Sequence, residues 1–216
     1  KRGEDFRWNI SISNQLVESK RFQNLLPYII LNKHAHLKMY NFQKEGSKWL
    51  LDNPCRILAD DMGLGKTLQS LNAIQNLFFK NKIKNCFIFC PKSLRQNWAH
   101  EIKKWLPFFE VKIFSDLLKR IKNFNNEDFI SSNIYIVTYP EIEKLAVILN
   151  QNNLVLDLII ADEAHKLRNE TSKINNIITK IKRQRTWLLT GTPLERDTKD
   201  IKNILKILNP KKRLVL

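Results

Sequence analysis

The sequence predicts an α/β fold in which a mostly parallel sheet is flanked by helices on both faces, giving three layers. Six short apolar runs, each of four to six residues, alternate with amphipathic segments along most of the chain. The runs are rich in β-branched and aromatic residues, as strands buried on both faces are. Regular alternation of strands and helices favours parallel pairing with right-handed crossovers.

The expected elements follow in chain order. The strands are the runs 55–59, 86–90, 111–114, 134–138, 156–161 and 187–190. Helical spacing of apolar residues covers 67–80, 93–106, 140–150, 172–182 and 197–208. A looser helical pattern comes before them, so we expect an N-terminal helical extension, 1–36, ahead of a main part, 37–216. The polar, Asn-rich stretch 123–133 is expected to be a surface loop.

The composition is that of a globular protein with a strong positive charge. The chain has 216 residues, of which 43% are hydrophobic and 27% are charged. Wholesale disorder and a fibrous repeat are therefore excluded, and a chain of this length buries a real core. Lys and Arg number 37 against 21 Asp and Glu, a net charge of +16. Such an excess favours a polyanionic partner, and the alternative is a solubility charge in a chain rich in Lys, Asn and Ile.

The cysteine content and the hydropathy of the chain limit the cellular compartments in which we expect it. Cys55, Cys86 and Cys90 are too few and too odd in number for a disulfide framework, and their spacing does not match a zinc site. We interpret them as core residues in a reducing compartment. No apolar run reaches the length of a membrane span, and no signal peptide is evident. Because the chain begins without Met and ends just after an expected helix, we expect it to be a piece of a longer protein.

A glycine-containing loop follows the first expected strand and precedes an apolar helix. Gly63 and Gly65 let the backbone curl around a phosphate, whose negative charge a helix N-terminus favours. Lys66 would reach the β- and γ-phosphates, and the Thr67 hydroxyl would ligate Mg²⁺. The generic phosphate-loop pattern fails at its first position, which is Asp60. The alternative is a tight turn before a helix.

Two carboxylates follow the expected strand 156–161. The carboxyl end of a buried parallel strand points into the crevice where ligands bind. Asp162 would hold Mg²⁺ through water, and Glu163 would orient and deprotonate an attacking water. The alternative is a helix N-cap with acidic residues in the first turn. A phosphate loop followed by these two acids indicates a nucleoside-triphosphate site far more specifically than either feature alone.

The tryptophans are interpreted as structural residues, and a basic cluster has two possible interpretations. Trp98 and Trp105 lie two helical turns apart, which predicts a packing face. Trp49 and Trp187 lie in or beside apolar runs and are expected in the core. The basic cluster 180–185 fits either a DNA-binding patch or a solvated helix end, and the sequence does not decide between them.

Six segments in order resemble the motifs of superfamily-two helicase-like ATPases, and among them the Swi/Snf family of DNA translocases. The segments are MYNFQKEG at 39–46 (the Q motif), ILADDMGLGKT at 57–67 (motif I), CPKSLRQNW at 90–98 (Ia), IVTYP at 136–140 (Ib), DEAHKLRN at 162–169 (II) and LLTGTPL at 188–194 (III). The resemblance runs from about 37 to 208. The Leu-Thr-Gly-Thr-Pro-Leu form of motif III separates it from RNA helicases, which usually carry Ser-Ala-Thr there.

The sequence departs from the family pattern at three places. Asn41 stands where Pro is common, and Asp61 stands where Glu is commoner. The segment 195–197 reads Glu-Arg-Asp where eukaryotic remodellers usually show Gln-Asn. These departures favour a bacterial or phage-like branch. The expected location is then the cytoplasm at the nucleoid, or the nucleus if the source is eukaryotic.

The resemblance implies a RecA-like phosphate-loop fold that forms the first of two motor lobes, with the second lobe absent from this chain. ATP and Mg²⁺ would be clamped between the lobes, and duplex DNA would lie across both. The implied nucleotide contacts are Gln43, Asp61, Met62, Gly63, Leu64, Gly65, Lys66 and Thr67, with Thr67 and Asp162 at the metal and Lys66, Asp162 and Glu163 in catalysis. The implied DNA-backbone contacts are Pro91, Lys92, Ser93, Thr138 and Tyr139, and the implied coupling residues are Thr190, Gly191 and Thr192.

The expected function is therefore that of the first motor lobe of an ATP-dependent double-stranded DNA translocase or remodeller. One alternative is a nucleotide- or DNA-binding module without turnover of its own, and another is the first lobe of an RNA helicase. The isolated lobe should be nearly inactive as an ATPase because the family's arginine finger comes from the second lobe.

Overall fold

The computed structural model describes residues 39–120, 133–168, 173–191 and 198–208. The expected N-terminal extension, 1–36, and nearly all of the expected loop 123–133 lie outside these residues, so both stay predictions.

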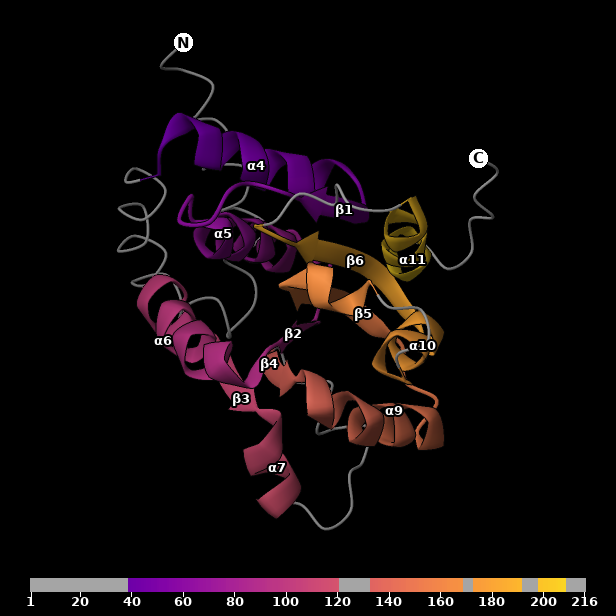
Figure 1. Cartoon of the computed structure of the whole chain (residues 1–216). Coiled ribbons are helices and arrows are strands. Elements are labelled where there is room, and N and C mark those ends of the chain that lie inside the picture. The colour runs from indigo at the N-terminus through magenta and orange to yellow at the C-terminus, as the bar shows by residue number, and fades with distance from the viewer. Residues whose placement is uncertain (1–38, 121–132, 169–172, 192–197, 209–216) are drawn as a thin grey trace. The chain divides into compact units, whose positions relative to one another are not determined.

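A six-stranded parallel sheet forms the centre of the fold (Figure 1). Its order is β1-β6-β5-β2-β4-β3, and every neighbouring pair is parallel. The strands are β1 (Cys55–Leu58), β2 (Asn85–Cys90), β3 (Glu110–Ile113), β4 (Asn133–Thr138), β5 (Leu156–Asp162) and β6 (Arg183–Leu189). The predicted α/β class and the strand–helix alternation are confirmed. The carboxyl ends of β1, β6 and β5 lie side by side, which places the loops that follow them together.

Helices cover both faces of the sheet (Figure 1). One face packs against α4 (Asn41–Asp52), α5 (Lys66–Phe79) and α6 (Arg95–Trp105). The other packs against α7 (Phe114–Arg120), α9 (Ile142–Gln151), α10 (Lys173–Lys180) and α11 (Thr198–Leu208). Short 3₁₀ turns, η1 (Lys92–Leu94), η2 (Tyr139–Glu141) and η3 (Ala164–Leu167), follow β2, β4 and β5. Among the described residues, no helix has the length and apolar character to cross a membrane.

The central strand β2 shows how the core is divided. Cys86, Ile88 and Cys90 point to the α4–α6 side, and Phe87 and Phe89 point to the α7–α11 side. All five side chains are fully buried. Alternating residues of one strand therefore fill two separate cores, which is why the run is apolar throughout. The interpretation of Cys86 and Cys90 as core residues is confirmed, and no disulfide joins the described cysteines.

Strand β6 begins four residues earlier than its apolar run. The first residues of the strand are polar, and Arg183 shows a structural reason for this. The Arg183 guanidinium donates hydrogen bonds to the carbonyls of Ile178 and Ile181, at 2.6 and 2.8 Å, and so closes the end of α10. Burial lowers the Arg183 pKa to about 10. Arg183 is thus a half-buried cation with a structural role at this helix end, and the DNA-binding interpretation of the basic cluster stays a prediction.

The tryptophan expectations are partly confirmed. Trp98 and Trp187 are buried, as predicted. Trp49 is 47% exposed, so its expected place in the core is wrong. Its ring stacks under Arg56 at 3.8 Å, and its indole N–H donates to the Ile57 carbonyl at 3.1 Å. Trp49 therefore covers the outer edge of β1 rather than filling the interior.

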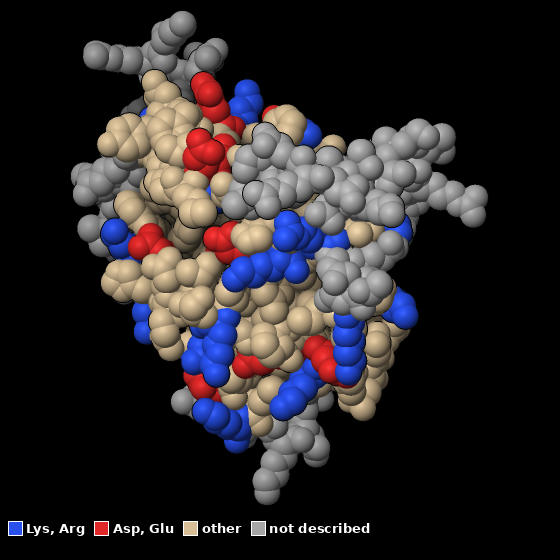
Figure 2. Space-filling model, viewed as in Figure 1, with Lys and Arg blue, Asp and Glu red and all other residues tan. Residues whose placement is uncertain are grey.

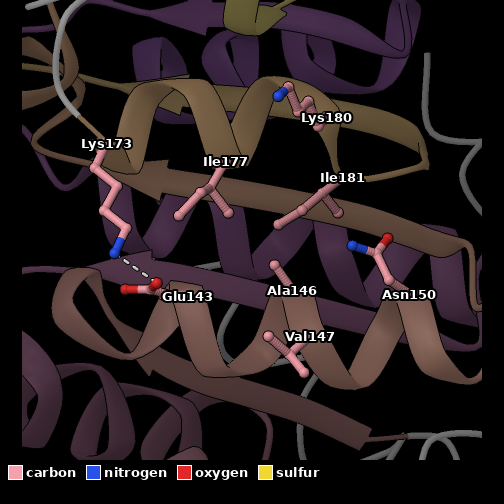
Figure 3. A pocket seen from close by; sticks show the side chains of 8 residues that line it. All are labelled: Glu143, Ala146, Val147, Asn150, Lys173, Ile177, Lys180 and Ile181. Atoms are coloured by element: carbon pink, nitrogen blue, oxygen red, sulfur yellow. Dashed lines mark ion pairs between the residues drawn. The ribbon is translucent and has the colours of Figure 1, made fainter.

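Charged side chains are spread over the face seen in Figure 2, where Lys and Arg outnumber Asp and Glu. The basic groups lie between uncharged areas and do not form one continuous patch in this view.

Candidate active site

The loop between β1 and α5 lies at the carboxyl edge of the sheet, against the end of β6. The Thr190 backbone N–H donates to the Leu58 carbonyl at 3.1 Å, which ties the two strand ends together. Gly63 and Gly65 both have left-handed backbone, with φ of 83° and 76°. Other residues adopt this conformation only at a cost, so the glycines allow the loop to turn sharply into the helix.

Lys66 is the first residue of α5, and its ammonium lies inside the curl of the loop. Its Nζ donates to the carbonyls of Asp60 and Asp61, at 2.7 and 2.9 Å. A Cβ placed on Gly191 would come within 3.2 Å of Lys66 Nζ and 2.7 Å of Met62 Cγ. A side chain at position 191 would therefore displace Met62, and the end of β6 packs directly on the loop. This contact brings the segments of motifs I and III together.

A buried glutamine, which no sequence motif indicated, holds the Asp60 carboxylate in place. Gln69 is fully buried, and its Nε2 donates to Asp60 Oδ2 at 2.8 Å and to the Leu64 carbonyl at 3.2 Å. A Cβ on Gly46 would lie 1.8 Å from Gln69 Oε1, so glycine there admits the glutamine between α4 and α5. Asp60 thus has a role as an anchor of the loop.

Gln43 lies on α4 and is 8% exposed. Its Oε1 accepts from the Tyr40 backbone N–H at 3.1 Å, and its Nε2 donates to the Leu64 carbonyl at 3.2 Å. A Cβ on Gly65 would come within 2.5 Å of that nitrogen. Gln43 therefore supports the loop with both ends of its amide, and its predicted contact with adenine stays a prediction.

Asp162 ends β5, and its carboxylate is held by two donors. Oδ2 accepts from the Trp98 indole N–H at 2.8 Å, and Oδ1 accepts from the Glu163 backbone N–H at 2.9 Å. Burial raises the Asp162 pKa, and these hydrogen bonds and the Lys66 ammonium oppose the rise. The lysine of the loop and the carboxylate after β5 are thus close enough to interact electrostatically.

Glu163 has left-handed backbone, with φ of 54°. Such a conformation is uncommon for a residue with a side chain, and apart from helix ends and turns it clusters at functional sites. Glu163 Oε2 lies 3.2 Å from His165 Nδ1, and both atoms are buried without a well-formed hydrogen bond. The candidate base is therefore oriented toward a neighbouring imidazole but keeps free acceptor capacity. His165 was visible in the sequence only as the last letter of DEAH.

The oxygen donors fit Mg²⁺. Magnesium is usually bound by one or two carboxylates together with substrate phosphates and water, rather than by an all-protein cage. Asp162 supplies a half-buried carboxylate, and Thr67 supplies a half-buried hydroxyl in the first turn of α5. Within the described ranges, no group of three or more His, Cys, Asp or Glu side chains gathers at a metal-binding distance. The set suits a metal that arrives with a nucleotide.

The predicted DNA-backbone contacts fall into two groups. Lys92 and Ser93 are exposed on η1, directly after β2, and Pro91 before them is buried. Ser93 caps neither η1 nor α6, whose N-cap residues are Pro91 and Leu94.

Thr138 and Tyr139 are 3% and 7% exposed. The Thr138 hydroxyl donates to Glu141 Oε2 at 2.8 Å, and the Tyr139 hydroxyl donates to the Asp162 carbonyl. Their predicted DNA contact stays a prediction. Of the predicted coupling residues, Thr190 is buried and Thr192 lies outside the described residues.

Comparison with known proteins identifies the family of this chain. The model of the SNF2-related domain matches residues 42–213. The chain is 31% identical over 173 residues to the chromatin remodeling factor mit1 of Schizosaccharomyces pombe, covering 76% of this chain and 12% of mit1. It is 34% identical over 201 residues to the human DNA repair and recombination protein RAD54B, covering 85% of this chain and 21% of that protein.

A solved structure is similar as well. The Sulfolobus solfataricus SWI2/SNF2 ATPase core in complex with dsDNA superimposes with a TM-score of 0.69 at 28% identity, over 81% of this chain and 36% of that one. The chain thus spans only a small part of the relatives it matches. Its fold is that of part of the SWI2/SNF2 ATPase core. The chain belongs to the SNF2-related domain family.

Proposed function

We propose that this chain is the first motor lobe of an ATP-dependent double-stranded DNA translocase or remodeller. The observation that carries the proposal is the meeting of three segments at one edge of the sheet. The loop with Lys66, the end of β5 with Asp162 and Glu163, and the end of β6 with Gly191 lie within contact or electrostatic reach of one another.

Nucleotide binding would use the loop as follows. The Lys66 ammonium now bonds two loop carbonyls, and it would exchange these for β- and γ-phosphate oxygens. The loop residues 61–67 would provide backbone N–H groups at a helix N-terminus, which favours anions. Thr67 and Asp162 would hold Mg²⁺, which neutralises phosphate charge when bound. Gln43 would recognise adenine by turning one end of its amide away from the loop.

Hydrolysis would depend on Glu163. A carboxylate with free acceptor capacity at the γ-phosphate position orients a water and accepts its proton. His165, 3.2 Å from Oε2, would keep the carboxylate in place. The transition state also needs a cation at the γ-phosphoryl oxygens, and an arginine finger from a second RecA-like lobe would supply it.

Duplex DNA is the nucleic acid along which we propose that the motor moves. The Sulfolobus core was solved with dsDNA, and two of the relatives are named for chromatin remodelling and for DNA repair and recombination. The exposed Lys92 and Ser93, at the end of β2, provide a cation and a hydroxyl suited to phosphate oxygens. Contacts to the backbone alone give binding without sequence preference. These relatives favour DNA over the RNA helicase alternative, and a eukaryotic source would place the protein in the nucleus.

The test uses the full-length protein and measures phosphate release with duplex DNA, single-stranded DNA and RNA in parallel. We expect duplex DNA to stimulate ATP hydrolysis most, and Lys66→Ala to abolish it. ATP should be preferred over GTP if Gln43 reads adenine. Lys144→Ala is a matched control, because Lys144 is an exposed lysine on α9 of the same lobe, outside the six motif segments. Stimulation by RNA alone would overturn the DNA assignment, and equal use of GTP would remove Gln43 from the site.

A further inference from the structure

A buried tryptophan contacts the proposed metal carboxylate. Trp98 lies on α6 and is 1% exposed, and its one polar atom points at Asp162 Oδ2 at 2.8 Å. Packing alone requires only the ring, which contacts the core between α6 and the sheet. The hydrogen bond adds a specific link between residues that are 64 positions apart in the sequence.

Asp162 is fixed from three directions. Trp98 holds Oδ2, the Glu163 N–H holds Oδ1, and the Tyr139 hydroxyl donates to the Asp162 main-chain carbonyl. These donors come from α6, from the residue after β5 and from the residue after β4. Each carboxylate oxygen accepts one hydrogen bond here and has two lone pairs, so each keeps one for a further ligand. The arrangement restricts rotation of the carboxylate without using up its acceptor capacity.

We propose that Trp98 is a positioning residue for Asp162, holding the carboxylate in the orientation that receives Mg²⁺ with the nucleotide, and that Tyr139 assists by holding its backbone. The inference rests on the proposed function. It gives Tyr139, a buried residue first predicted to touch DNA, a role inside the lobe. Groups that orient a metal ligand commonly change metal affinity by about 10- to 100-fold when they are removed.

The chain offers a matched control on the same helix. Trp105 is seven residues beyond Trp98, and its indole N–H donates to Glu101 Oε2, also at 2.8 Å. Trp98→Phe and Trp105→Phe therefore each remove one indole N–H from α6. In the wild-type protein each of these N–H groups donates a hydrogen bond to a carboxylate. Only one of the two carboxylates lies at the proposed metal site.

The experiment measures binding of a fluorescent, non-hydrolysable ATP analogue to the full-length protein as Mg²⁺ is titrated. We expect Trp98→Phe to raise the Mg²⁺ concentration for half-maximal binding by about tenfold or more. Binding without Mg²⁺ should not change, because the phosphate loop is intact. Trp105→Phe should behave as wild type. Tyr139→Phe should shift the Mg²⁺ requirement in the same direction as Trp98→Phe, and it serves as the test if Trp98→Phe does not fold.

Two results would overturn the assignment while leaving the proposed function in place. One is a folded Trp98→Phe protein, or failing that Tyr139→Phe, with the wild-type Mg²⁺ requirement. The other is an equal shift in Trp105→Phe, which would indicate a general effect of α6. A wild-type protein that binds no nucleotide at any Mg²⁺ concentration would instead overturn the proposed function, and this inference with it.

Discussion

The two edges of the sheet satisfy their polar groups in different ways. At the amino edge, Asp157 accepts from the backbone N–H groups of Lys84 and Asn85 and from the Gln184 amide. At the carboxyl edge, Glu163 Oε2 and His165 Nδ1 are buried without a well-formed hydrogen bond. Buried polar atoms are nearly always paired in folded proteins, so exceptions require an explanation. The amino edge is built for stability, and the carboxyl edge keeps acceptors available for a ligand.

Left-handed backbone shows the same contrast. Asn81 and Asn153 follow helices α5 and α9 at the amino edge and end them in a standard way. The bonds Lys82 N–H to the Leu77 carbonyl and Leu154 N–H to the Leu149 carbonyl, both 2.9 Å, complete those turns. Glu163 ends no helix, so its φ of 54° has no such explanation. Strain at the carboxyl edge therefore supports a functional role for this residue.

The largest expected effect is a loss of ATP hydrolysis when the carboxyl edge is changed. Glu163→Gln should lower DNA-stimulated phosphate release by the full-length protein by about 10²- to 10⁴-fold, because the amide cannot accept a proton. Nucleotide binding and the melting temperature should not fall, since no strong hydrogen bond is lost. Hydrolysis at the wild-type rate would show that Glu163 is not the base.

The counterpart at the amino edge is Asp157→Ala. It leaves two backbone N–H groups without their acceptor and should cost about 1–3 kcal/mol in the free energy of unfolding. Specific activity of the folded protein should not change. Urea denaturation and the same phosphate assay measure both quantities, and a loss of activity without a loss of stability would break the comparison.

The third prediction concerns the core between the edges. Burial raises the Cys90 pKa from 9.0 to about 12. The folded protein therefore binds more protons than the unfolded chain between pH 9 and 12, and stability falls as the pH rises through that window. Over the whole window Cys90 would account for up to about 4 kcal/mol. Urea denaturation between pH 8 and 10.5 should show a shallower decline for Cys90→Ala than for wild type. Equal slopes would contradict the role given to burial.

The smallest expected effect is at Asn153. Asn153→Ala should destabilise the fold by about 1 kcal/mol, because alanine tolerates left-handed backbone less well than asparagine. Asn153→Gly should be neutral or slightly stabilising. Thermal unfolding of the two variants measures the difference. Equal melting temperatures would mean that the left-handed turn imposes no cost at this edge.

The sequence predicted the core and the loop well because each depends on local pattern. The apolar run of β2 and the glycines before Lys66 carry their structural meaning in neighbouring residues. Helix α4 was missed because Gly46 interrupts it, and only the packing of Gln69 explains that glycine. The polar start of β6 was missed because Arg183 serves α10, an adjoining element.

The interactions that complete the site were beyond sequence reasoning for a different reason. Trp98 was predicted to be buried, but its hydrogen bond to Asp162 depends on the sheet order that brings β2 beside β5. The exposure of Lys92 and the burial of Tyr139 are likewise properties of the assembled edge. Spacing along the chain does not encode either one.

The central claim is that this lobe carries the nucleotide-binding half of a two-lobe motor. The direct test is phosphate release by the 216-residue chain alone and by the full-length protein, each with and without duplex DNA. An arginine finger is worth about 10³- to 10⁵-fold in rate, so the chain alone should hydrolyse ATP near background and ignore DNA. The full-length protein should show DNA-stimulated turnover. Robust DNA-stimulated turnover by the chain alone would contradict the two-lobe account.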